Sequence, residues 1–163
     1  MVVFDASILI DLLNPRTASD RRAKLENLLS ELQKSKSKIQ IPTPALSEFL
    51  AGAGKARDSY YQKLSASSAF QVIPFDARAA MECALMIDEV YTKADKPARI
   101  KTWAKAKFDW QIVAIAKVVG ATVIYSDDGD IKRIGQRFGI KTIKTDDLPL
   151  PASARQGKLN LDA

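Results

Sequence analysis

Directly after Met1 comes the stretch Val2-Val3-Phe4-Asp5-Ala6-Ser7-Ile8-Leu9-Ile10, in which a short apolar run is followed by an acid and then by a second apolar run with helical character. This order predicts a strand over residues 2–4 and a helix over residues 7–13, with Asp5 at the carboxyl end of the strand. Ligands of open α/β sheets bind at that edge. Capping of the following helix is the structural alternative for Asp5. Ser7 is placed to hydrogen-bond either Asp5 or a ligand.

The rest of the chain alternates short strand patterns with longer helical ones. This predicts a single α/β domain, a three-layer α/β/α fold with a central parallel sheet of about five strands. We expect the domain to cover residues 1–148 and a C-terminal tail, loosely ordered or docked on a partner, to cover residues 149–163. The further strands are predicted at 38–41, 70–73, 122–125 and 140–143, and the further helices at 20–34, 44–53, 57–67, 77–91, 101–119 and 130–138.

Residues at four positions predict where these helices begin or end. Thr43 with Pro44 predicts an N-cap followed by proline at the first helical position, and Asp76 predicts a second N-cap. Gly120 and Gly139 stand where C-terminal caps belong.

The composition is basic and lacks histidine. Among 163 residues, 25 Lys and Arg oppose 19 Asp and Glu, for a net charge of +6. Such a surface favours a polyanionic partner, although a merely solvated basic surface is the alternative. The one cysteine, Cys83, excludes an intrachain disulfide and a cysteine zinc cluster. No apolar run approaches the roughly 20 residues of a membrane span, and no signal peptide is recognisable, so we expect a cytoplasmic protein with no membrane association.

Two acids fall on predicted helices beside apolar residues. Asp109 shares a helical face with Ile112, Val113 and Ala116, where a carboxylate needs a cation or good hydrogen bonds. Glu48 borders the apolar arc of its helix. Attraction to the helix N-terminus explains Glu48 equally well, and an ion pair with Lys105 one turn earlier is the weaker alternative for Asp109.

An acidic turn, Ser126-Asp127-Asp128-Gly129-Asp130, follows the strand predicted over residues 122–125. Three neighbouring acids repel one another unless cations or helix-start amides neutralise them. We expect Asp128 to join Asp5, Glu48 and Asp109 at one edge of the sheet, with Asp130 as second choice and Asp127 as third. Asp130 alternatively caps the next helix.

A cluster of carboxylates in a chain without histidine suits a hard divalent cation, which prefers oxygen ligands. The order and spacing of the segments around Asp5, Glu48, Asp109 and Asp128 resemble the PIN domain family, in particular the VapC-type ribonuclease toxins of bacterial toxin–antitoxin pairs. The resemblance covers residues 1–148. It implies that these four acids hold Mg²⁺ or Mn²⁺, with Ser7, Ser126, Asp130 and Asp127 in supporting positions. It also implies an RNA substrate, a cognate antitoxin and a homodimer.

The predicted activity is endoribonucleolytic hydrolysis of RNA by metal-activated water, in which Asp5 and Asp109 are the best candidates for direct ligation. The basic side chains expected to bind the RNA backbone are Lys105, Lys107, Lys132 and Arg133. The basic segment 92–107 predicts a helical hairpin or a substrate clamp, or else a solvated helix connection.

Three other functions are weaker alternatives. An aspartyl phosphatase would carry a second acid two residues after Asp5, where Ser7 stands. A phosphoacceptor receiver domain would place an aspartate at the end of the third strand, where Ile73-Pro74 stands. The third is a metal-free RNA-binding or interaction module with an inactive pocket of the same shape.

Overall fold

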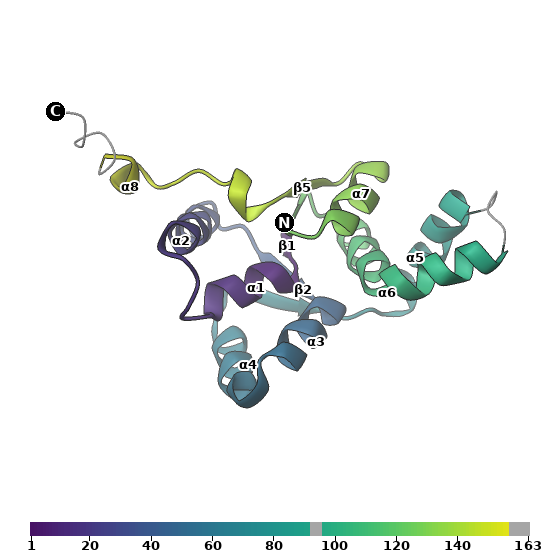
Figure 1. Ribbon diagram of the computed structural model, residues 1–163, viewed down its shortest axis with the longest axis horizontal. Coiled ribbons are helices and arrows are strands. Elements are labelled where there is room, and N and C mark those ends of the chain that lie inside the picture. Colours follow the sequence, from purple (N-terminus) through teal and green to yellow (C-terminus); the bar gives the residue numbers. More distant parts are fainter. Residues whose placement is uncertain (92–95, 157–163) are drawn as a thin grey trace.

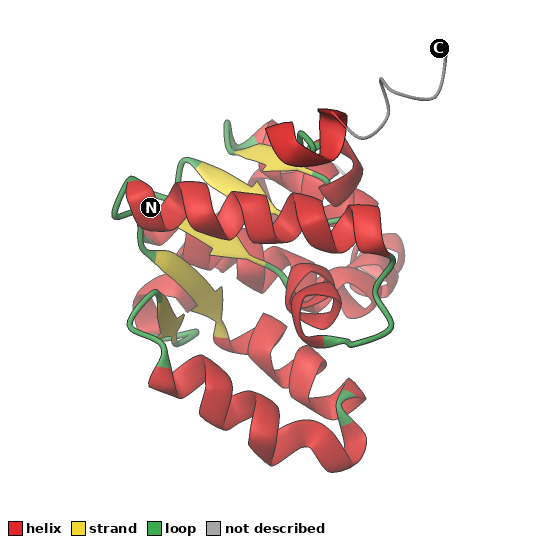
Figure 2. Cartoon of the chain, turned by 90° about the vertical axis from the view of Figure 1, so that its left-hand side faces the viewer, coloured by secondary structure: helices red, strands yellow, loops and turns green. Residues whose placement is uncertain are grey.

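A five-stranded parallel sheet forms the centre of the protein (Figures 1 and 2). The computed structural model describes residues 1–91 and 96–156, with side chains over 1–91 and 106–154. The strands are β1 (Val2–Phe4), β2 (Ile39–Pro42), β3 (Phe70–Ile73), β4 (Val123–Tyr125) and β5 (Lys141–Ile143), in the spatial order β3-β2-β1-β4-β5. All four pairings are parallel. The predicted parallel sheet is therefore confirmed.

Helices cover both faces of this sheet (Figure 2). Side chains alternate along β1, so that Val2 and Phe4 enter one core and Val3 enters the other. The first core is formed with α1, α2, α3 and α4, and the second with α5, α6 and α7. Their bounds are α1 (Ala6–Leu13), α2 (Ser19–Lys34), α3 (Thr43–Gly52), α4 (Arg57–Ala66), α5 (Ala77–Tyr91), α6 (Lys96–Val118) and α7 (Gly129–Arg137). The three-layer α/β/α prediction is confirmed.

The order of the strands reverses between β1 and β4. From β1 the chain builds outward through β2 to β3, and then returns to place β4 on the other side of β1. The register pairs Phe4 with Tyr125, so Asp5 and Ser126 are the next residues beyond two adjacent carboxyl ends. The amide of Asp5 donates to the Tyr125 carbonyl over 3.1 Å. Ligands bind open α/β sheets at such a reversal of strand order.

Helix α6 is irregular at one residue. Ala106 has non-helical dihedral angles (φ −114°, ψ 17°), which divides α6 into two segments. The segment after Ala106 buries Trp110 and the run Ile112–Ala116 against the sheet. The segment before it packs with α5 as a hairpin that projects beyond the sheet (Figure 1). A helical hairpin was one prediction for residues 92–107; residues 92–95 and the side chains of 96–105 lie outside the described part.

Local details differ from prediction at four places. Pro42, not Thr43, is the N-cap of α3, because the Thr43 hydroxyl instead accepts the Phe75 amide over 3.0 Å. Short helices η1 (Gly54–Ala56), η2 (Thr145–Asp147) and α8 (Ala152–Gln156) were not predicted. They are too short to carry a helical apolar period.

The other predicted helix caps are confirmed. Asp76 accepts the Ala79 amide over 2.9 Å, and Gly120 and Gly139 have positive φ angles of 66° and 74° after α6 and α7. Cys83 is buried among the apolar side chains of the second core, where burial raises the pKa of its thiol to about 11. Within residues 1–91 and 96–156, no helix combines the length and apolar character that spanning a membrane requires.

A substitution at Gly135 would test how closely α7 packs on β5. A Cβ at this position would lie 3.0 Å from Thr142 Oγ1 and 3.2 Å from the Ile140 carbonyl oxygen. We expect Gly135→Ala to lower the free energy of unfolding by about 1–3 kcal/mol, the usual cost of overpacking. The measurement is chemical denaturation. Gly52→Ala is the control, because a Cβ there meets nothing within 4 Å; a similar loss in both variants would contradict the packing argument.

Candidate active site

Asp5 is a buried carboxylate at the reversal of strand order. Only 4% of the residue is exposed. It is the N-cap residue of α1, as the structural alternative expected, but its side chain makes no capping hydrogen bond. Instead its Oδ2 atom accepts the Ser126 hydroxyl over 2.8 Å and the Ser7 hydroxyl over 3.1 Å. Burial raises the pKa of Asp5, and the Ser126 hydrogen bond offsets part of this increase.

The same two serines join Asp5 to the acidic turn. Ser126 Oγ accepts the Asp128 amide over 3.0 Å, and Ser7 Oγ accepts the Asp127 amide over 3.1 Å. Each hydroxyl thus receives a backbone proton from the turn and gives its own to Asp5 Oδ2. We infer that Oδ1 is the oxygen that Asp5 presents to a ligand. Of the two hydrogen-bond partners predicted for Ser7, the structure shows Asp5.

Asp128 begins α7. Its Oδ1 accepts the amides of Asp130 over 2.6 Å and Ile131 over 3.2 Å, which makes Asp128 the N-cap. The alternative in which Asp130 caps this helix is therefore wrong. Ligand oxygens of Asp109, Asp128 and Asp130 all lie within 4.8 Å of one another. Asp130 also accepts Arg133 over 2.9 Å, so part of its charge is already neutralised.

Asp109 lies three residues beyond the irregular residue Ala106, directly before the buried Trp110. Burial raises its pKa to about 7, and the charges of Asp128, Asp5, Asp130 and Glu48 contribute to that increase. The sheet-facing residues that follow Asp109 fix its position.

Glu48 is exposed on α3 but responds to the same charges. Partial desolvation raises its pKa, and the nearby charges of Asp5 and Asp128 raise it further. Oxygens of Asp109, Asp128 and Asp130 thus lie within 4.8 Å of one another, and Asp5 and Glu48 are near enough for their charges to raise the pKa of Asp109. We call these five residues the acidic cluster: Asp5, Glu48, Asp109, Asp128 and Asp130.

Asp127 points away from this cluster. Its Oδ1 accepts the Thr145 amide over 2.8 Å, and its Oδ2 accepts the Thr145 hydroxyl over 3.0 Å together with the Arg21 guanidinium. The turn therefore divides its three acids between two sides. Arg21 and Thr145 were not among the predicted residues. Arg21 lies on a helix rich in charged residues, and two of its partners, Asp127 and Asp146, are more than a hundred residues away. The sequence therefore offered no local signal for these contacts.

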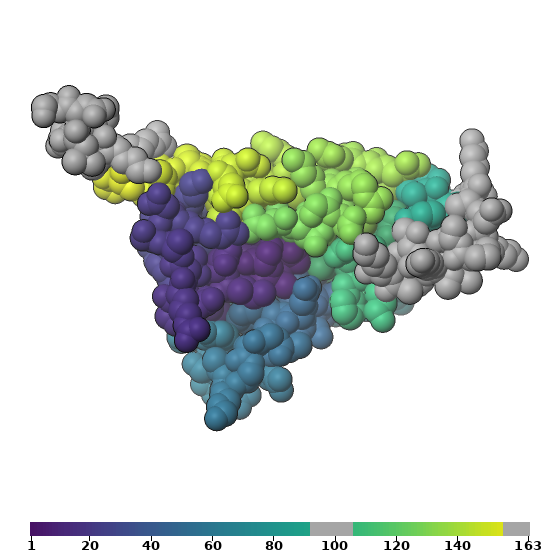
Figure 3. Space-filling view, viewed as in Figure 1, coloured from purple at the N-terminus to yellow at the C-terminus, as the bar shows by residue number. Residues whose placement is uncertain are grey.

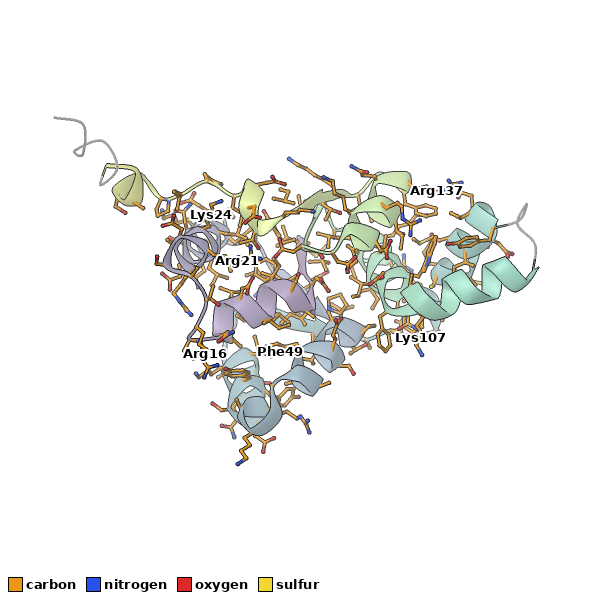
Figure 4. All side chains as sticks on the ribbon, in the orientation of Figure 1. Arg16, Arg21, Lys24, Phe49, Lys107 and Arg137 are labelled. Carbon is orange, nitrogen blue, oxygen red and sulfur yellow. The ribbon has the colours of Figure 1, made fainter. Side chains whose placement is uncertain are left out.

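The predicted basic residues lie in different settings. Lys107 is exposed, with its ammonium 5.4 Å from the centre of the Phe108 ring. Arg133 pairs with Asp130, and Lys132 is half-buried on α7. The side chain of Lys105 lies outside the described part. Figure 4 shows Lys107 on α6 and Arg137 on α7.

The donor set fits a hard divalent cation. The acidic cluster offers carboxylate oxygens alone, as Mg²⁺ and Mn²⁺ prefer. The raised pKa values of Asp5, Glu48 and Asp109 show that these carboxylates are poorly compensated without a cation. A bound cation would relieve this mutual repulsion.

The free-energy cost of placing these acids together can be measured from the pH dependence of the protein's stability. The pKa of Asp109 is about 7 in the fold, against 3.8 ordinarily. Between roughly pH 4 and pH 7 the folded state therefore keeps a proton that the unfolded chain has released, and stability falls as the pH rises. We expect Asp109→Asn, in EDTA, to melt at a higher temperature than the wild type. The difference should be small near pH 4, grow toward pH 7 and then level off.

Glu26→Gln, which alters an exposed acid on α2, is the control and should show no such growth. A difference between Asp109→Asn and wild type that stays constant from pH 4 to pH 8 would contradict the placement of Asp109.

Solved structures of other proteins share this fold. The structure of VapBC2 from Rickettsia felis, bound to a DNA fragment from its promoter, matches with a TM-score of 0.61 and 19% identity, covering 88% of this chain and 98% of that one. DNA-bound VapBC from Salmonella typhimurium matches with a TM-score of 0.56 and 18% identity, covering 88% and 97%. Mycobacterium tuberculosis VapC20, a toxin that cleaves the sarcin-ricin loop, matches at 0.56 and 15%, covering 83% and 95%.

No curated protein matches the sequence. The family model of the PIN domain matches residues 2–137, a span that contains all five members of the acidic cluster. The chain belongs to the PIN domain family.

Proposed function

We propose that the protein is a Mg²⁺- or Mn²⁺-dependent endoribonuclease and the toxin of a toxin–antitoxin pair. The observation that carries the proposal is the group of Asp109, Asp128 and Asp130, whose oxygens lie within 4.8 Å of one another in a PIN domain chain, with the charges of Asp5 and Glu48 close by. The nuclease domain would comprise residues 1–148, followed by a tail over residues 149–163. The net charge of +6 suits a polyanionic substrate.

Each acid of the cluster has a distinct role in this proposal. Asp5 would ligate through Oδ1, because its Oδ2 is held by the two serine hydroxyls. Asp109 would ligate from the rigid segment of α6. Asp128 would ligate through Oδ2, because its Oδ1 caps α7. Glu48 would ligate or orient the attacking water from the exposed side. Asp130, already paired with Arg133, would contribute least.

When bound, the cation would lower the pKa of a water and stabilise charge on the phosphate. The protein's own residues hold the carboxylates in place; Ser7 and Ser126, for example, fix Oδ2 of Asp5. Lys107, Lys132 and Arg133 are proposed contacts for the RNA backbone, with Lys105. Hydrolysis by water should leave a 5′-phosphate and a 3′-hydroxyl. The sequence has no histidine to activate the 2′-hydroxyl.

The structural neighbours support a protein partner. Two of the matching structures are VapBC complexes, and we propose that this chain likewise binds a cognate antitoxin. A homodimer and a cytoplasmic location complete the proposal.

Metal-dependent cleavage is tested with purified protein and total RNA. We expect cleavage with Mg²⁺ or Mn²⁺, and none with EDTA. Asp5→Asn and Asp109→Asn should each lower the rate by roughly 100- to 1,000-fold, since each 1.4 kcal/mol of lost transition-state stabilisation is tenfold. Glu26→Gln should cleave as the wild type does. End-labelling should identify 5′-phosphate products.

Cleavage that survives EDTA, or equal cleavage by the wild type and both asparagine variants, would refute the metal-dependent nuclease. RNA binding without cleavage under every metal condition would instead favour the binding-module alternative.

The fourth acid is tested by comparing two asparagine variants. Asparagine caps helices about as well as aspartate, so Asp128→Asn keeps the α7 cap while removing the charge. We expect it to weaken Mn²⁺ binding, measured by calorimetry, more than Asp130→Asn does, because Asp130 shares its charge with Arg133. The reverse order would make Asp130 the fourth ligand.

A further inference from the structure

Arg21 on α2 forms ion pairs with three carboxylates from three other segments. Its Nε lies 2.5 Å from Asp11 Oδ2 on α1, and its Nη1 lies 3.1 Å from Asp146 Oδ1 on η2. Its Nη2 pairs with Asp127 Oδ2 in the acidic turn. We call these four residues the Arg21 network. Arg21 lies on α2 beside α1 and the segment that contains η2 (Figure 4).

The network fixes Asp127 completely. Both carboxylate oxygens of Asp127 are engaged, one by the Thr145 amide and the other by the Thr145 hydroxyl and Arg21. The side chains of Arg21 and Asp127 are only 29% and 25% exposed. Partly desolvated, hydrogen-bonded charge pairs are held far more firmly than exposed ones.

A continuous chain of bonds leads from Asp127 to the acidic cluster. The Asp127 amide donates to Ser7 Oγ, and Ser7 donates to Asp5 Oδ2. On either side of Asp127, Ser126 donates to Asp5, and Asp128 joins the group formed with Asp109 and Asp130. A displacement of Asp127 would therefore move two members of the cluster and both serine hydroxyls.

We propose that Arg21 is a positioning residue for the metal site: by holding Asp127 outside the acidic cluster, it fixes the turn that places Asp128 against Asp5 and Asp109. The inference rests on the proposed function. Arg21 touches no member of the cluster in the contacts described, and it acts through Asp127.

Charge explains why a single arginine has this effect. Three carboxylates surround one guanidinium, so removal of Arg21 leaves three like charges close together. Repulsion would then act mainly between Asp127 and Asp11, because the Asp146 side chain is 86% exposed and solvent screens its charge. That repulsion would displace Asp127, and the turn with it. Each of the three guanidinium nitrogens already faces a carboxylate, which suits positioning rather than phosphate binding.

The test compares substitutions on α2 in the full-length protein. Arg21→Met removes the charge and keeps most of the aliphatic stem. Arg21→Lys keeps the charge without the three-way geometry. Lys24→Met is the matched control, because Lys24 also reaches η2 from α2, donating to the Asp146 carbonyl over 2.6 Å, but bonds the backbone rather than Asp127. Circular dichroism establishes that each variant is folded.

We expect Arg21→Met to raise the Mn²⁺ dissociation constant, measured by calorimetry or electron paramagnetic resonance, by roughly 10- to 100-fold, the usual loss when a partner behind the ligands is removed. Arg21→Lys should recover part of the loss, and Lys24→Met should bind Mn²⁺ as the wild type does. The KM for RNA should stay unchanged, and excess Mn²⁺ should restore kcat. Asp127→Asn combined with Arg21→Met should cost less than the sum of the two single changes, because both act through one contact.

A folded Arg21→Met protein with wild-type Mn²⁺ affinity would overturn the inference, as would an equal loss in Lys24→Met. A raised KM for RNA with unaltered Mn²⁺ affinity would do the same, because it would make Arg21 an RNA contact. If Arg21→Met does not fold, Arg21→Lys and Asp127→Asn carry the same comparison. Wild-type protein that binds no Mn²⁺ would overturn the proposed function together with the inference, whereas failure confined to the variants overturns the inference alone.

Discussion

The buried carboxylate of Asp5 is the constraint on which the site depends. It lies where β1 and β4 end side by side. Its Oδ2 accepts hydrogen bonds from Ser7 and Ser126, two serines that are distant from each other in the sequence. A buried carboxylate is costly unless it is well hydrogen-bonded. The two hydroxyls offset part of that cost, and they also connect the first strand–helix unit to the acidic turn. The space-filling view shows α1 between α3 and the segments after β4 (Figure 3).

The sequence predicted the fold well because local periodicity determines most of it. All five strands lie within one residue of the predicted bounds, since apolar runs between helical segments leave few alternatives. Asp109 was also predictable from the sequence, because its helical face continues into Ile112, Val113 and Ala116, all buried in the structure. Where Thr43 was expected to cap, a contact with Phe75 from another segment overrode the local preference.

The different contacts of the three aspartates of the turn could not be predicted. Asp127, Asp128 and Asp130 are chemically identical and adjacent, so only distant partners separate them. Arg21 and Thr145 draw Asp127 outward, and the start of α7 takes Asp128 Oδ1. Nothing near Arg21 in the sequence marks it as different from the other basic residues of α2. The acidic cluster therefore follows from local patterns, whereas its orientation follows from contacts across the fold.

The three helices that follow β1, β2 and β4 have a consequence for the charge of the site. Because the sheet is parallel, α1, α3 and α7 all begin at its carboxyl edge; α1 and α7 begin directly after Asp5 and Asp128, whereas Glu48 lies five residues beyond the start of α3. Each helix start carries about half a positive elementary charge from its aligned peptide dipoles. The backbone thus supplies a fixed positive potential without any basic side chain. That potential favours the carboxylates at rest, and it would equally favour the phosphate of an approaching polyanion.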